Sequence, residues 1–114
     1  MSLKLGLRHT GDVAVIDVGG RITIGEEAVA FRDAVQKLGK SNPAKVLLNL
    51  AELAYVDSSG TGELVAAYSL IANQGGQLKL VNVGKRIRDV FRIAQLTPLF
   101  QIYEDEAAAI QSFR

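Results

Sequence analysis

The sequence predicts an α/β domain built on one mixed sheet with about four helices. Strand-like and helix-like segments alternate along the chain, and short runs of turn residues separate them. Such alternation is typical of parallel strands joined by right-handed helical crossovers. A chain of 114 residues, 48% hydrophobic and with two prolines, is long enough for one core and too short for two. We therefore treat residues 1–114 as a single domain.

The first part of the chain is expected to form a hairpin and a helix. Residues 3–7 and the segment "DVAVIDV" at 12–18 should be antiparallel strands joined through "HTGD", with the first at the edge of the sheet. Residues 26–38 place apolar side chains on one face of a helix, and Gly39 should end it. The residues expected in the core are Val13, Val15 or Ile16, Val18, Ala28, Phe31, Val35 and Leu38.

Strands and helices continue to alternate in the second part. "PAKVLLNL" at 43–50 is the near-continuous apolar run of a strand covered on both faces, and "QLKLVNV" at 77–83 should be its parallel neighbour. A helix between them ends at "NQGG", and a third begins at Lys85. A short strand, "FQIY", and the helix "EDEAAAIQSF" complete the chain. The apolar helix positions are Leu64, Ala67, Tyr68 and Ile71, then Ile87, Val90, Phe91 and Ala94.

Composition excludes several classes of function. The formal net charge of +1 provides no strong field for nucleic acid, and no apolar run approaches the roughly 20 residues that cross a bilayer. The absence of cysteine removes disulfides, thiol catalysis and thiolate metal sites, and it agrees with a reducing compartment. We expect a soluble, cytoplasmic protein with no direct contact to nucleic acid and no membrane insertion.

The loop "YVDSSGTG" at 55–62 lies where a predicted parallel strand gives way to a helix, a common position for ligands and partners. It lacks the G-x-S-x-G spacing of a nucleophile elbow, and His9 is the only histidine. Val65 interrupts a dinucleotide-type glycine pattern, and Gly84–Lys85 does not end a P-loop. The carboxylates are dispersed along the chain. We expect no catalytic residue, no cofactor and no metal.

The adjacent hydroxyls of Ser58 and Ser59 have two interpretations. Serine and aspartate are common N-caps, worth about 1 kcal/mol each. Yet one helix needs one cap, and "DSSG" offers three candidates. Gly60 and Gly62 should leave the nearby backbone thinly covered, so at least one serine should be open to another protein. A phosphate there would lie near exposed helix N–H groups, which tolerate its charge.

Two long segments, "VLLNLAELAYVDSSGTGELVAAY" and "GGQLKLVNVGKRIRDVFRIAQLTPLFQIYEDEAAAI", resemble the STAS domain of bacterial anti-sigma factor antagonists. The resemblance implies a STAS-like mixed sheet and a regulatory binding module that is not an enzyme. In that family an anti-sigma factor, a serine kinase of the histidine-kinase-like ATPase type, phosphorylates the first serine after the aspartate. That position is Ser58 here. The unphosphorylated form binds the kinase, phosphorylation releases it, and a PP2C-type phosphatase restores the first state.

The chain differs from the family pattern at two positions. Thr23 in "GGRITIGEEA" stands where an acidic residue that contacts the kinase is common, and Thr61 replaces a bulky aliphatic residue. Thr61 could be a further phosphate acceptor or could remove only a helix-favouring contact.

The resemblance leaves a second kind of function open. STAS domains also serve as subunits of lipid-transporting ABC systems or of stress-sensing assemblies, where they dock without phosphorylation. The sequence does not determine the oligomeric state, and a weak homodimer is left open.

A basic stripe gives a second indication of a partner surface. Lys85, Arg88 and Arg92 are spaced three and four residues apart, opposite the apolar face of the third predicted helix. Either this is an ordinary solvated face, or it attracts an acidic partner surface and raises the association rate. The residues expected to bind the partner are Asp57, Ser58, Ser59, Gly60, Thr61, Thr23, Lys85 and Arg88.

Overall fold

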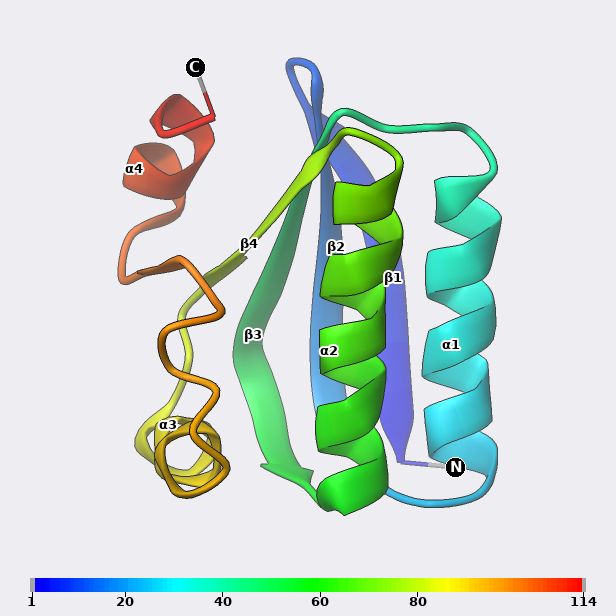
Figure 1. The fold of residues 1–114 in the computed structure, drawn as a ribbon, viewed down its shortest axis with the longest axis vertical. Coiled ribbons are helices and arrows are strands. Elements are labelled where there is room, and N and C mark those ends of the chain that lie inside the picture. Colours follow the sequence, from blue (N-terminus) through cyan, green and yellow to red (C-terminus); the bar gives the residue numbers. More distant parts are fainter. Residues whose placement is uncertain (1, 114) are drawn as a thin grey trace.

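The computed structural model describes residues 2–113, which form one mixed sheet with strand order β1-β2-β3-β4-β5 (Figure 1). β1 is antiparallel to β2, and the remaining neighbours are parallel. The strands are β1 (Leu3–Thr10), β2 (Val13–Ile22), β3 (Lys45–Val56), β4 (Gln77–Val81) and β5 (Ile102–Tyr103). The expected α/β class and the antiparallel edge strand are confirmed, as is the parallel pairing of the strands at 46–50 and 78–83.

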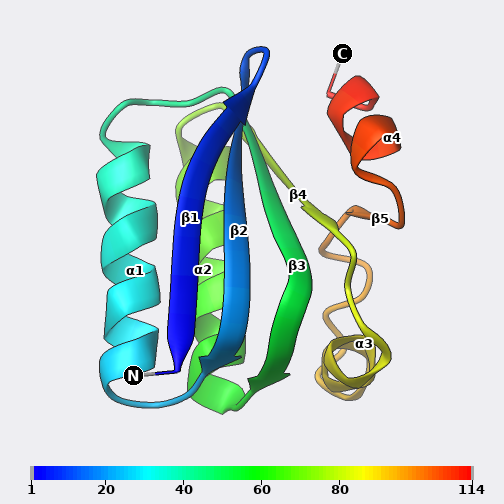
Figure 2. The same cartoon turned by 180° about the vertical axis from the view of Figure 1, so that it is seen from behind.

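Helices cover the two faces of the sheet unequally. α1 (Glu26–Gly39) and α2 (Ser58–Asn73) lie side by side on one face, and Figure 2 shows the opposite face largely open over β1 and β2. α3 (Lys85–Ile93) lies beyond β3, near the lower end of the molecule in Figure 1. α4 (Glu106–Gln111) contributes Ala109 to a small cluster on the second face, with Phe113 beside it.

The two-sided cover explains the pattern of β2. Ala14, Ile16 and Val18 belong to the main core, whereas Val13 and Val15 pack in the α4 cluster. All five are buried, so the sequence alternatives Val15 and Ile16 are both core residues. The β2 pattern is therefore a nearly continuous apolar run because alternate side chains enter two different clusters.

Two details of the helices differ from expectation. Gly39 lies inside α1 as its last residue, and a methyl group there would come within 3.0 Å of Leu70, so the glycine permits close packing against α2. Ala94 was expected to point inward but is exposed, because α3 ends at Ile93. Phe100 fills that side of the core instead, with its ring centroid 5.1 Å from that of Phe91. None of the helices in residues 2–113 combines the length and apolar character needed to cross a membrane.

The start of α2 packs directly on the end of β2. A methyl group on Gly60 would lie 2.1 Å from the carbonyl oxygen of Ile22, so only glycine fits at this point. Gly62, two residues further along the same helix, has open space around it. The two glycines of "SSGTG" therefore have different roles, and Gly60 sets how closely the helix approaches the sheet.

The connection from β2 to α1 is organised by the buried carboxylate of Glu27. It accepts hydrogen bonds from the Thr23 hydroxyl (2.6 Å), from the backbone N–H of Ser2 (3.1 Å) and from the Arg21 guanidinium (3.1 Å). These donors, the Thr23 hydroxyl first, lower the pKa of Glu27 to about 2 from its ordinary value of 4.5. The charged form of Glu27 therefore stabilises the folded state.

We predict that Gly60→Ala lowers the free energy of unfolding by about 3 kcal/mol, because the added methyl group must displace either α2 or the Ile22 carbonyl. Urea unfolding measures the effect. Gly62→Ala is the matched control and should stabilise the helix by about 1 kcal/mol, since its position is open. Equal effects at the two positions would show that the close approach at Gly60 does not constrain the fold.

Glu27→Gln should destabilise the protein at pH 7, and its difference from the unsubstituted chain should shrink as the pH falls. The folded-state pKa of Glu27 is depressed, so its contribution is complete above the unfolded-state value and is lost as the pH falls from about 5 toward about 2. Thermal unfolding across that range tests the prediction. Glu26→Gln, an exposed neighbour, should have a much smaller effect at pH 7. A destabilisation by Glu27→Gln that stays constant with pH would contradict the assignment.

Candidate functional site

Asp57 joins the β3–α2 loop to the β2–α1 loop. One carboxylate oxygen accepts from the backbone N–H of Gly60 (2.8 Å) and caps α2, and the other accepts from the backbone N–H of Ile24 (2.8 Å). These backbone donors, Gly60 first, lower the pKa of Asp57 below its ordinary value. Asp57 is therefore a charged structural residue, and it is the N-cap that the sequence left undecided among three candidates.

Ser58 is the first residue of α2, and it is exposed. Val56, two residues earlier, is buried, with only 2% of its surface exposed. Ser59 is half-buried. Since Asp57 supplies the cap, neither serine is needed to cap the helix. The Ser58 hydroxyl thus lies at the start of α2, directly after Asp57, whose carboxylate is held by the backbone N–H groups of Gly60 and Ile24.

Gly60 and Thr61 are not part of an open surface. Gly60 is buried against β2, so the expectation that it leaves the loop thinly covered is wrong; the close contact with Ile22 is the physical reason. Thr61 is only 7% exposed, and its hydroxyl donates to the carbonyl oxygen of Asp57 (2.9 Å). The Thr61 hydroxyl is therefore covered while the first turn of α2 stays folded.

Thr23 lies in the β2–α1 loop, which the hydrogen bond between Ile24 and Asp57 links to the site. Its hydroxyl is bound to Glu27, and its neighbour Ile24 donates to Asp57. The structure therefore brings Thr23 and Asp57 into one connected group. The carboxylate that binds Thr23 is that of Glu27, in the first turn of α1, and it is buried.

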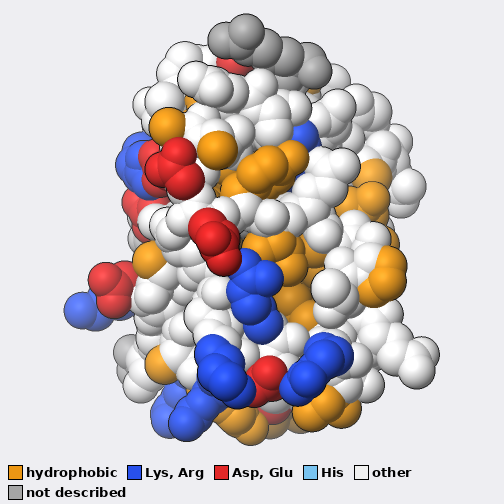
Figure 3. All heavy atoms as spheres, turned by 90° about the vertical axis from the view of Figure 1, so that its left-hand side faces the viewer, with side chains coloured by type: hydrophobic (Ala, Val, Ile, Leu, Met, Phe, Trp, Pro, Cys, Tyr) orange, Lys and Arg blue, Asp and Glu red, His pale blue; other side chains and the backbone are white. Residues whose placement is uncertain are grey.

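Lys85 and Arg88 lie on α3, at the same end of the molecule as the start of α2 but across the end of β3 (Figure 1). Asp89 lies between the cations and pairs with Lys85 (3.0 Å) and Arg92 (3.0 Å). Arg88 donates to the carbonyl oxygen of Val83 (3.1 Å). Figure 3 shows several basic side chains gathered on this face around an acidic one. The basic stripe is thus exposed but partly neutralised.

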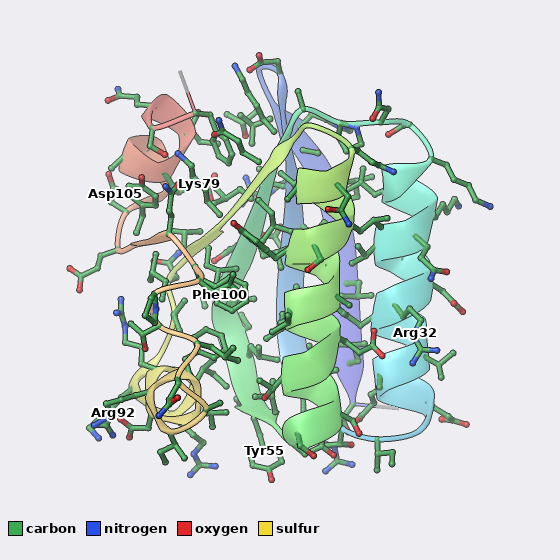
Figure 4. The ribbon with its side chains drawn as sticks, in the orientation of Figure 1. Arg32, Tyr55, Lys79, Arg92, Phe100 and Asp105 are labelled. Carbon is green, nitrogen blue, oxygen red and sulfur yellow. The ribbon has the colours of Figure 1, made fainter. Side chains whose placement is uncertain are left out.

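Two exposed apolar residues near the loop were not singled out from the sequence. Ile24 is 78% exposed although its backbone binds Asp57, and Tyr55 is 43% exposed two residues before Asp57. Figure 4 shows Tyr55 at the lower end of the molecule, beside the start of α2. The sequence does carry a signal for the exposure of Ile24. This isoleucine lies in a turn that ends with Gly25, outside the apolar patterns of the strand before it and the helix after it. The site therefore combines a hydroxyl, a fixed negative charge and apolar side chains.

This arrangement suits recognition and modification of Ser58 by another protein. An exposed hydroxyl at the first turn of a helix can accept a phosphate without disturbing the core. Within residues 2–113, no group of three or more histidine or acidic side chains is placed to hold a metal ion. Ser58 is thus a hydroxyl of this loop to which a group can be attached at the surface while α2 stays folded.

Comparison with known proteins agrees with this architecture. The STAS domain family model matches residues 4–109. The anti-sigma-B factor antagonist of Bacillus subtilis (strain 168) is 24% identical over 111 residues, which covers 97% of this chain and 100% of the relative.

Solved structures show the same fold. A crystal structure of an anti-sigma factor antagonist from Mycobacterium paratuberculosis has a TM-score of 0.85 at 22% identity, covering 99% of this chain and 95% of that one. The Bacillus cell fate determinant SpoIIAA in its phosphorylated form has a TM-score of 0.75 at 22% identity, covering 97% and 100%. Because the family model spans nearly all of the sheet and its helices, this chain belongs to the STAS domain family.

Proposed function

We propose that this chain is an anti-sigma factor antagonist whose binding is switched off by phosphorylation of Ser58. The unphosphorylated form binds an anti-sigma factor that is itself a serine kinase of the histidine-kinase-like ATPase type. A PP2C-type phosphatase restores that form. The chain acts in the cytoplasm as a binding module and catalyses no reaction. The observation that carries the proposal is the exposed Ser58 hydroxyl at the start of α2, held beside the fixed carboxylate of Asp57.

Exposure favours Ser58 over the other hydroxyls of the loop. Ser59 is half-buried, and the Thr61 hydroxyl is buried and bonded to Asp57. Names of relatives support the role: the Bacillus subtilis relative is an antagonist of an anti-sigma factor, and SpoIIAA has a phosphorylated form. Ser58 is thus the acceptor that a kinase could reach while α2 stays folded.

Electrostatics explain how one phosphate would end binding. Phosphoserine adds about −1.5 to −2 charges at pH 7. Asp57 already places a negative charge beside Ser58, and a phosphate would add to it. A partner surface that fits the neutral Ser58 hydroxyl would have few groups placed to neutralise the phosphate charge. A partner carboxylate about 5 Å away would repel each added charge by on the order of 3 kcal/mol at an effective dielectric constant of 20, before screening. The fold should be unaffected because Ser58 is solvated.

We predict that Ser58→Glu weakens binding to the cognate kinase-type anti-sigma factor by at least about tenfold, with a melting temperature close to that of the unsubstituted chain. Isothermal titration calorimetry and thermal unfolding provide the two measurements. If Ser58→Glu binds as tightly as the unsubstituted chain, the phosphate switch is refuted. Docking onto a transporter ATPase or a stress-sensing assembly without phosphorylation then becomes the better account.

The companion variant Ser58→Ala should keep binding and should accept no phosphate from the kinase, as measured by intact-protein mass spectrometry. Stoichiometric phosphorylation of Ser58→Ala would show that another residue, for example Ser59 or Thr61, is the acceptor. In that case the switch could still operate, but its assigned residue would be wrong.

A further prediction concerns the apolar rim of the site. Ile24→Ser should weaken partner binding by about tenfold, because burial of a large aliphatic side chain at an interface contributes about 1.5–3 kcal/mol. Since Ile24 is largely exposed in the isolated chain, the melting temperature should hardly change. Val29→Ser is the matched control on the outer surface of α1, where the residue is 45% exposed. Unchanged affinity of Ile24→Ser would place the interface elsewhere.

A further inference from the structure

β1 and α1 form a groove that the proposed switch does not use. Its volume is about 510 Å³, and its apolar wall consists of Leu5, Leu7, Ile16 and Leu38. His9 and Lys37 lie on its rim. The groove follows the later part of β1 and the last turns of α1, near the β1–β2 hairpin, whereas Ser58 lies at the other end of the molecule (Figures 1 and 2).

The backbone on the outer side of β1 is open to pairing. β1 is the edge of the sheet, and no strand within residues 2–113 pairs with its outer side. The carbonyl of Ser2 accepts from the N–H of Arg21 (3.0 Å), and the register continues unbroken to Thr10 opposite Val13. Alternate residues of an antiparallel ladder bond to the partner strand. Leu5, Leu7 and His9 therefore direct their N–H and C=O groups outward.

The same residues that offer their backbone also line the groove. Because side chains alternate along a strand, Leu5, Leu7 and His9 face α1, and Lys4 and Arg8 face the opposite side. Leu7 is 56% exposed at the mouth of the groove. A strand added beside β1 would continue this alternation, and every second side chain would enter the groove below α1.

Charge indicates which kind of strand fits. β1 carries Lys4 and Arg8 and no carboxylate, and Lys37 adds a cation on α1. Arg8 already pairs with two carboxylates, Asp17 (2.8 Å) and Glu106 (2.7 Å), so its charge is offset. The cations of this edge that form no ion pair within residues 2–113 are Lys4 and Lys37. A second copy of the chain would bring the same two lysines to this edge. An acidic strand is therefore complementary to it and a second copy is not.

We infer that the β1–α1 groove binds an extended segment of another protein that pairs antiparallel or parallel with β1, places apolar side chains in the groove and carries acidic side chains between them. Addition of a strand to an exposed sheet edge gives affinity through main-chain hydrogen bonds and specificity through pockets for alternate side chains. This surface is independent of Ser58, so a partner here could be held in both states of the proposed switch.

The test uses the full chain and two short capped peptides, one alternating valine with glutamate and one alternating valine with lysine. Fluorescence anisotropy should show binding of the glutamate peptide and at least about tenfold weaker binding of the lysine peptide. Amide hydrogen exchange followed by NMR should slow at Leu5, Leu7 and His9, whose N–H groups point outward, when the glutamate peptide is present.

Charge reversal gives a matched pair of variants. Lys4→Glu, on the face of β1 that the glutamate side chains of the added strand would share, should weaken binding of the glutamate peptide by about fivefold. Arg86→Glu makes the same change of net charge on the exposed surface of α3 and should leave that affinity unchanged. Thermal unfolding confirms that both variants fold.

Three results would overturn the inference. The first is failure of the glutamate peptide to bind, or equal binding of the lysine peptide. The second is slowed exchange at amides outside β1. The third is a dimer of the chain alone, detected by sedimentation, with the same three amides already protected, because a second copy would then occupy the groove.

Discussion

The close contact between the start of α2 and the end of β2 is the constraint on which the site depends. Gly60 lies against the carbonyl of Ile22, where no side chain fits, and the Asp57 carboxylate holds both loops through the N–H groups of Gly60 and Ile24. Helix position, loop geometry and the exposure of Ser58 follow from this one junction. A helix set further from the sheet would lose both the cap and the link between the loops.

At this junction the exposed residue Ser58 lies within two residues of the core on either side. Val56 and Gly60 are buried and Ser58, between them, is exposed. The proposed phosphorylation of Ser58 would therefore add charge at the surface and leave the packing beneath it unchanged. Because the pKa of Asp57 is lowered by backbone donors, its negative charge is a permanent part of that surface at neutral pH. The proposed switch would need no conformational change within the domain.

The other end of the molecule is organised differently. Arg8 binds Asp17 on β2 and Glu106 on α4, so one guanidinium ties the hairpin to the last helix. This contact, together with Ala109 and Phe113, covers part of the second face of the sheet. The rest of that face and the outer side of β1 remain open, because α1 and α2 both lie on the first face (Figure 2). The fold thus offers two separate surfaces, one at the carboxyl ends of the parallel strands and one along the edge.

The sequence by itself determined the class of the fold, the order of strands and helices, and the loop that carries Ser58. These follow from local patterns, because periodicity and turn residues reflect which side of each segment meets the core. It could not assign the cap among Asp57, Ser58 and Ser59, the burial of Thr61, or the exposure of Ile24 and Ala94. Those outcomes depend on contacts between residues distant in sequence, such as Gly60 with Ile22 and Asp57 with Ile24. Only the tertiary structure decided them, since local sequence patterns do not specify how closely a helix approaches a sheet.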